Sequence, residues 1–349
     1  YGGSMRNSTG NDLAMNYTAQ RNSLNTIGLL GPTAVLDAAG GNTTRSLRMA
    51  GSATNLASVV NLNNGTLIAN RIYATSPLTP SIFNFNGGTL TVGASTSYTA
   101  NFLQGLTAAT VYPGGAVFDT AGASVSVNQC LLAPTGYGLS YLPLRSNGAG
   151  YIGAPVVVIT GGSGTGATAV ASVDVTDGSP TKGTVTGVSI TSPGFGYLPT
   201  DTPTVSLYGG GTLSPATFNA CSLGLNDASG GLTKLGLGTL TLGGTNTYGG
   251  ATVVSNGVLV LAVREALPTN SVIRLDGGSL NASGFTLTNR SLTVTSGSVN
   301  NGKLVCDSVV KTGSGQWTLG TSLSSTNPII VSEGVLKLQS AVPGLYEGT

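Results

Sequence analysis

Short runs that alternate apolar and polar residues, separated by glycine corners, recur along this chain of 349 residues. In the clearest run, residues 239–242 alternate Thr with Leu, the period-2 pattern of a half-buried strand. Residues 251–254 and 258–261 form two more such runs. Asn256 and Gly257 between them favour a tight corner, because both residue types tolerate positive φ angles. Three short strands joined by glycine corners predict one coil of a β-solenoid.

The same unit occurs a second time. Residues 311–320 align with 234–243, and residues 331–338 align with 254–261, both at a spacing of 77 residues. One shared spacing means that the unit was repeated without an insertion, and such repetition determines the architecture of a chain. A lysine, several glycines and alternate apolar residues define the unit. They are Lys234, Gly236, Gly238, Leu240, Leu242 and Gly257 in the first repeat, and Lys311, Gly313, Gly315, Trp317, Leu319 and Gly334 in the second.

The first repeat, residues 230–261, resembles the autotransporter-associated β-strand repeat, also called the passenger-associated transport repeat. The usual form of that repeat is Gly-Gly-Leu-Thr-Lys-x-Gly-x-Gly-Thr-Leu-x-Leu, followed by Asn-x-Tyr-x-Gly and Asn-Gly-Gly-x-Leu. The second repeat, residues 309–338, departs from it with Gln316-Trp317 in place of Thr-Leu, with no Tyr-Gly corner, and with Glu333 in place of Asn. The resemblance implies an all-β chain with a right-handed parallel β-helix, in an exported bacterial protein that is extracellular or at the cell surface.

The remaining pattern divides the chain into four segments. Looser corner-and-strand units, with Gly65 and Gly88 23 residues apart, predict that residues 31–135 form the first part of the β-helix. Residues 219–349 form its second part. Residues 1–30 are the least regular, and we expect an irregular segment there that could supply a strand to a neighbouring subunit.

Residues 136–218 break the coil rhythm and contain their own duplication. Residues 150–162 begin Gly-Tyr-Ile and contain Pro before an apolar run, and residues 196–210 repeat this order with Gly-Tyr-Leu. Two alternating runs lie between them, at 167–175 and 183–190, joined near an Asp-Gly turn. This pattern predicts a small antiparallel β domain that is inserted into the β-helix.

Composition excludes several classes of function. Only 7% of the residues are charged, against about 25% in typical globular chains, and the net charge is +2. The 14 basic residues are scattered, which argues against a nucleic-acid partner. A hydrophobic content of 40% argues against disorder, and no 18-residue apolar run predicts a membrane span in this chain. We expect a mature or excised piece of an exported precursor.

Catalytic chemistry has few candidates. The chain has no His, so the 12 acidic residues are the only candidates for acid–base groups, with Asp174 and Asp177 or Asp276 and Asp307 as possible pairs. Asp177 and Asp276 each precede glycine and are typical turn residues, which explains them without catalysis. We therefore expect no enzyme, and no cofactor. Zinc is not expected either, because His and Cys-x-x-Cys are absent.

Two further groups of residues leave alternatives open. Cys130 and Cys221 flank the inserted domain and could form a disulfide across its neck, or all three cysteines could be small buried residues. Aromatic residues could line a sugar-binding surface or pack in corners. They are Tyr137, Tyr141, Tyr151, Tyr197, Tyr208, Tyr248 and Trp317.

These observations favour a non-catalytic role. The ends of a solenoid carry unpaired strand edges, and a head-to-tail contact that does not close produces a filament. We expect a structural protein of the bacterial surface, a rigid β-helical rod that self-associates head to tail into a fibre. The alternative is an adhesin or glycan-binding module whose inserted domain contacts surface glycans. A polysaccharide-degrading β-helix enzyme is a weaker alternative, which requires clustered carboxylates.

Overall fold

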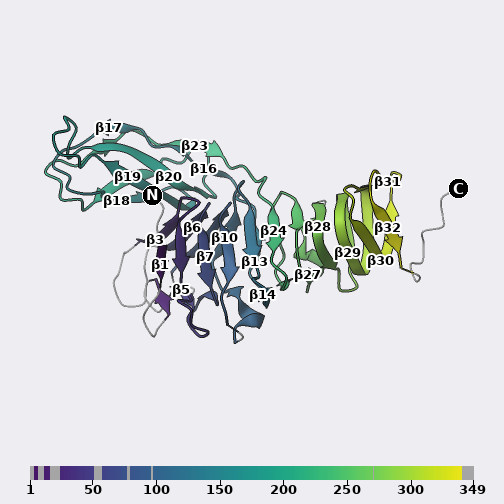
Figure 1. Cartoon of the computed structure of the whole chain (residues 1–349). Coiled ribbons are helices and arrows are strands. Elements are labelled where there is room, and N and C mark those ends of the chain that lie inside the picture. Colours follow the sequence, from purple (N-terminus) through teal and green to yellow (C-terminus); the bar gives the residue numbers. More distant parts are fainter. Residues whose placement is uncertain are drawn as a thin grey trace. The chain divides into compact units, whose positions relative to one another are not determined.

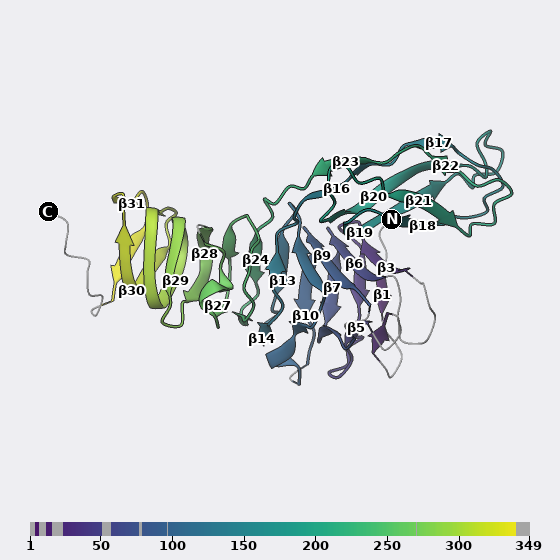
Figure 2. The same ribbon diagram turned by 180° about the vertical axis from the view of Figure 1, so that it is seen from behind.

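The computed structural model describes residues 4–6, 12–15, 24–50, 57–76, 79–95, 97–269 and 271–339. The chain divides into two compact units. The β-helix unit consists of residues 1–25, 29–133 and 228–349, and the inserted unit consists of residues 26–28 and 134–227. Each is drawn in Figures 1 and 2.

Parallel strands stacked in register build the β-helix unit, as the sequence predicts (Figure 1). One column contains β1 (Ser4–Arg6), β4 (Val35–Asp37), β7 (Thr66–Ala69), β10 (Thr89–Val92), β13 (Ala116–Asp119), β24 (Leu232–Leu235), β26 (Thr252–Val254), β28 (Val272–Asn281), β29 (Thr286–Lys311) and β31 (Ile329–Val331). Leu232 pairs with Thr252 and Val254 with Leu275, so successive coils of this half are 20 and 21 residues long.

A second column runs beside the first. It contains β2 (Leu13–Ala14), β5 (Leu47–Ala50), β8 (Ile72–Ala74), β11 (Leu103–Gln104), β14 (Ser124–Val127), β25 (Thr239–Leu242), β27 (Val258–Leu261), later parts of β28 and β29, β30 (Gln316–Ser325) and β32 (Val335–Leu338). A third sheet contains β3 (Leu24–Leu29), β6 (Ala57–Asn63), β9 (Ser81–Asn86), β12 (Ala108–Val111) and β15 (Leu131–Leu132).

In-register stacking places like positions of successive coils above one another in the interior. One such row is buried throughout: Leu36, Leu67, Leu90, Phe118, Lys234, Val254 and Leu275. The alternation read from the sequence therefore gives one inward and one outward face per strand. The row contains one charged residue, Lys234, among apolar neighbours.

The coils on either side of the insertion pair directly. Phe118 of β13 is the Cα partner of Lys234 of β24, and Val125 of β14 is the partner of Leu240 of β25. The inserted residues therefore leave and re-enter the β-helix between two consecutive coils without breaking the stack. Residues 1–30 contribute here too: β1 and β2 pair in parallel with β4 and β5, whereas residues 1–3, 7–11 and 16–23 lie outside the described residues.

The inserted unit is antiparallel. Its main sheet has the order β20 (Val185–Phe195), β19 (Thr165–Val173), β18 (Val156–Thr160) and β21 (Thr204–Tyr208). Two further pairs are β16 (Tyr137–Tyr141) with β23 (Ser222–Leu225), and β17 (Leu144–Ser146) with β22 (Thr217–Phe218). Residues 219–227, which we expected in the second part of the β-helix, thus belong to the inserted unit, because β23 pairs with β16.

The duplicated segments of the inserted unit lie against each other. Strands β18 and β21 pair antiparallel about Val158 and Ser206. A Cβ added at Gly164, after β18, would meet the Tyr197 ring at 2.2 Å, and one at Gly210, after β21, would meet the Tyr151 ring at 2.8 Å. Each tyrosine therefore packs on the glycine loop of the other duplicate, which explains both glycine-rich loops as packing features.

Helices contribute little to this architecture. The described residues contain only two short 3₁₀ turns, η1 (Thr99–Asn101) and η2 (Arg264–Ala266). No helix among the described residues has the length and hydropathy needed to cross a bilayer.

Candidate functional site: the lysine corners

Lys234 is fully buried, and it donates hydrogen bonds to three consecutive coils. Its Nζ lies 2.8 Å from the Leu235 carbonyl oxygen and 2.7 Å from that of Gly236, at its own corner. It also lies 3.2 Å from the Asn256 carbonyl oxygen of the next coil and 3.0 Å from Thr120 Oγ1 of the preceding coil. A buried ammonium is tolerated when its hydrogen bonds are satisfied, and here it also supplies donors to carbonyls that strands cannot pair.

Lys311 reproduces this geometry in the second repeat. Its Nζ donates to the carbonyl oxygens of Thr312 and Gly313, each at 2.6 Å, and to that of Glu333 at 3.2 Å. The acceptors stand one, two and 22 positions after the lysine in both repeats. Because the acceptor is a backbone carbonyl, the change from Asn to Glu333 leaves the interaction intact.

Glycines make these corners possible. Gly236 and Gly313 have φ angles of 77° and 70°, in the left-handed region that other residues rarely adopt. Gly238 is required for space instead, because a Cβ there would lie 1.7 Å from the Ala123 carbonyl oxygen. The glycine positions that define the repeat therefore answer to two separate steric demands.

Electrostatics keep this lysine structural. Burial lowers the pKa of Lys234 to about 8, and the nearby Asp119 carboxylate partly opposes that shift. The side chain is therefore still an ammonium at neutral pH. Since it is also fully buried, it can fasten coils but cannot reach a substrate.

The apolar repeat positions fill the interior. Leu240, Leu242, Trp317 and Leu319 are all fully buried. In the coil preceding Trp317, the Cα partner is Gly297, whereas Leu240 has Val125 there. The missing side chain at Gly297 makes room for the indole, whose Nε1 is buried without an acceptor among the described residues. Sequence reasoning found Trp317 but missed Gly297, which only the register reveals.

The expected aromatic surface does not form as a whole. Trp317 and Tyr248 are fully buried, and the Tyr248 hydroxyl lies 2.6 Å from Thr252 Oγ1. Tyr151 and Tyr197 are core residues of the inserted unit, and burial raises the pKa of Tyr197 to about 12. Of the seven candidate aromatics, only Tyr141 and Tyr208 are exposed.

The carboxylates hold local turns together. Asp174 accepts hydrogen bonds from Thr176 N at 2.9 Å and Thr181 Oγ1 at 2.7 Å, and Asp177 pairs with Lys182. Asp276 pairs with Arg274 at 2.9 Å, and Asp307 bonds Thr326 and Asn327 through its backbone carbonyl. Among the described residues, no three acidic, Cys or His side chains group as metal ligands would.

The expected disulfide is not formed. All three cysteines lie in described parts of the chain and are free thiols. Cys221 packs against the second core cluster of the inserted unit, beside Leu139 and Tyr197, and burial raises its pKa. Cys306 is buried in the β-helix unit, where burial raises its pKa to about 11. Cys221 and Cys306 therefore act as small apolar packing residues, the second of the two alternatives.

Comparison with known proteins identifies the repeats. The passenger-associated-transport-repeat family matches residues 232–261 and 309–338. A stretch of 102 residues is 39% identical to the adhesin BmaC autotransporter of Brucella suis biovar 1 (strain 1330), covering 29% of this chain and 3% of that protein. The chain thus spans a small part of the length of this relative, and no solved structure matches it. With two such repeats in one parallel β-helix, the chain is an autotransporter passenger-repeat protein, exported to the cell surface.

Proposed function

We propose that the β-helix unit is a rigid structural segment of a surface passenger, and that it extends by stacking a further parallel coil from a second molecule. The observation that supports this is the exposure of the coil formed by β31 and β32. Leu338, whose side chain faces inward with Leu319, is 47% exposed. Its counterpart Leu261 in the first repeat is fully buried.

The first repeat indicates what would cover this coil. There, β28 lies on β26 and β27, with Val258 opposite Ser279 and Leu259 opposite Leu280. Among the described residues, no strand occupies the corresponding place beyond β31 and β32. A coil stacked there would bury Leu338 and pair the open backbone groups of β32.

Inward and outward charges test this proposal. Leu338→Lys places an ammonium in the stacking interface, and Val335→Lys places the same charge on the outward face of the same strand. We expect the wild type and Val335→Lys to form filaments in electron micrographs at high concentration, and Leu338→Lys to remain monomeric in sedimentation. A wild type that stays monomeric at every concentration contradicts end-to-end assembly and leaves covering by the chain's own continuation.

A second candidate function is adhesion through the inserted unit. Tyr208, Val156 and Val170 are Cα partners across three adjacent strands, and they are 60%, 58% and 43% exposed. Such an exposed apolar row is typical of a contact surface. The similar Brucella protein is named an adhesin, which supports the same role here.

Deletion separates the two candidates. Joining Ala133 to Ala228 through a short Gly-Ser linker removes the inserted residues, while β13 can still pair with β24. We expect the deleted protein to keep its β-rich circular dichroism and its assembly. If the inserted unit is the contact surface, the deleted protein loses binding to cells or immobilised glycans. Unchanged binding would assign adhesion elsewhere.

A further inference from the structure

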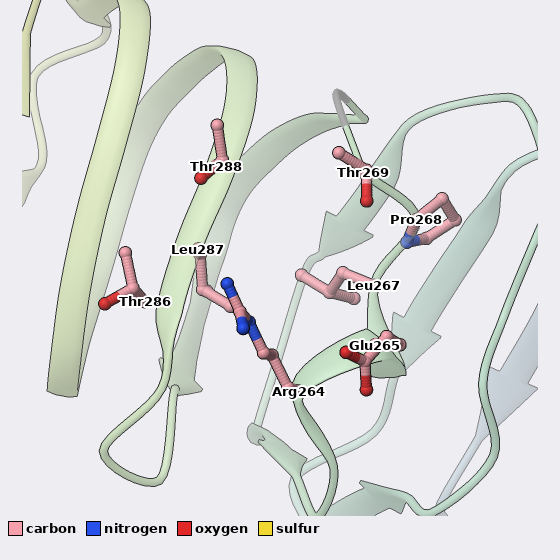
Figure 3. Close-up of a pocket in the computed structure, with 8 residues that line it drawn as sticks. All are labelled: Arg264, Glu265, Leu267, Pro268, Thr269, Thr286, Leu287 and Thr288. Atoms are coloured by element: carbon pink, nitrogen blue, oxygen red, sulfur yellow. The ribbon is translucent and has the colours of Figure 1, made fainter.

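A hollow lies on the side of the β-helix unit, between the loop that follows β27 and the first residues of β29 (Figure 3). Its volume is about 440 Å³, including space open to solvent. Leu267 and Leu287 are buried and provide an apolar floor. Thr286 and Thr288 are exposed and bring hydroxyl groups to its rim. The hollow therefore combines an apolar base with polar edges, which is the usual composition of a ligand site.

Two opposite charges flank this hollow without neutralising each other. Arg264 and Glu265 are adjacent in sequence and exposed, but they form no salt bridge. Figure 3 shows the Arg264 guanidinium reaching towards Leu287, while the Glu265 carboxylate lies on the side of Leu267. In a chain with only 7% charged residues, an unpaired arginine beside an apolar floor is an unusual placement.

The chemistry of the hollow selects a ligand class. A guanidinium binds a carboxylate through two parallel hydrogen bonds. The leucine floor can pack against the C–H face of a sugar ring, and threonine hydroxyls and the Glu265 carboxylate can bond ring hydroxyls. Glu265 would repel a ligand that carries several anionic groups, and a wholly apolar ligand would leave both charges desolvated. We infer that this hollow binds one uronic-acid residue of an acidic polysaccharide.

This inference is independent of the end-to-end assembly and of the contact surface on the inserted unit. Its test uses trigalacturonic acid as the probe, titrated into the full chain and followed by calorimetry or by saturation-transfer NMR. We expect saturable binding, and binding about tenfold or more weaker for the methyl-esterified trisaccharide, which lacks the carboxylates. Arg264→Gln should weaken binding of the acid by a similar factor and leave binding of the ester unchanged.

Arg274→Gln is the matched control. Arg274 lies in the same half of the β-helix unit, but it is paired with Asp276 at 2.9 Å. Its substitution should leave trigalacturonate binding unchanged. The absence of saturable binding, equal affinity for acid and ester, or full affinity in Arg264→Gln with a wild-type melting temperature would each overturn the assignment.

Discussion

The first and second repeats share one backbone path but differ in their surroundings. In both, a buried lysine donates to carbonyls one, two and 22 positions ahead. Lys234 has a fourth acceptor, Thr120 of the preceding coil, whereas three acceptors are found for Lys311 among the described residues. Trp317 stands where the first repeat has Leu240, and its coil partner is glycine rather than valine. The repeat therefore specifies the corner, and the neighbouring coils specify how the interior is filled.

Glycine substitution should produce the largest difference between the repeats. Gly238→Ala places a Cβ 1.7 Å from a backbone carbonyl, whereas Gly315→Ala places one 2.6 Å from the Ser296 side chain. Backbone cannot yield as a side chain can, so we expect losses of about 4 kcal/mol or more for Gly238→Ala and about 2 kcal/mol for Gly315→Ala. Urea unfolding measures both. Gly187→Ala in the inserted unit, where a Cβ meets nothing within 4 Å, is the control. Equal losses at Gly238 and Gly187 would refute the steric argument.

Lysine substitution tests the shared feature. Lys234→Met leaves four acceptors without a donor and should cost about 3 kcal/mol, while Lys311→Met leaves three and should cost about 2 kcal/mol. The exposed Lys303 of β29 provides the control, and Lys303→Met should change stability by less than about 0.5 kcal/mol. Denaturant midpoints compare all three. Stability unchanged by Lys234→Met would mean that the ammonium does not fasten the coils.

Exchange of the interior residues tests the difference. Trp317→Leu should cost about 2 kcal/mol, because the space above Gly297 is left unfilled, although the unpaired indole N–H is removed. Leu240→Trp should cost a comparable amount for the opposite reason, since Val125 occupies that space. Combining Leu240→Trp with Val125→Gly should recover part of the loss. Thermal unfolding of the single and double variants decides this, and strict additivity would count against the register-based explanation.

The pH dependence should give the smallest effect. The pKa of Lys234 is about 8 in the folded chain and 10.5 as a model value, so the unfolded chain binds more protons between these limits. The free energy of unfolding contributed by Lys234 should therefore rise with pH from about 8 to 10.5, by at most about 1 kcal/mol per pH unit. The stability difference between wild type and Lys234→Met isolates this contribution from other titrating groups. A difference that shrinks over this interval would reverse the assigned direction.

Much of the fold could be predicted from local patterns. The alternation at 239–242, the corner glycines and the 77-residue spacing predict parallel coils, and the structure confirms them. Local patterns could not place residues 219–227, because whether β23 pairs within the inserted unit depends on a strand more than 80 residues earlier. They also could not distinguish buried from exposed aromatics, since Tyr208 and Tyr197 occur in similar composition.

The sequence by itself determined the coil: its period, its corners and its inward residues, because each depends on a few neighbouring side chains and on the φ angles that glycine allows. Tertiary structure alone decided what each position contacts. Stacking brings Thr120, Lys234 and Asn256 together, sets Trp317 on Gly297, and joins Arg264 with Leu287 in one hollow. Those contacts depend on the register between coils, and register is set by the packing of the whole stack rather than by any single segment.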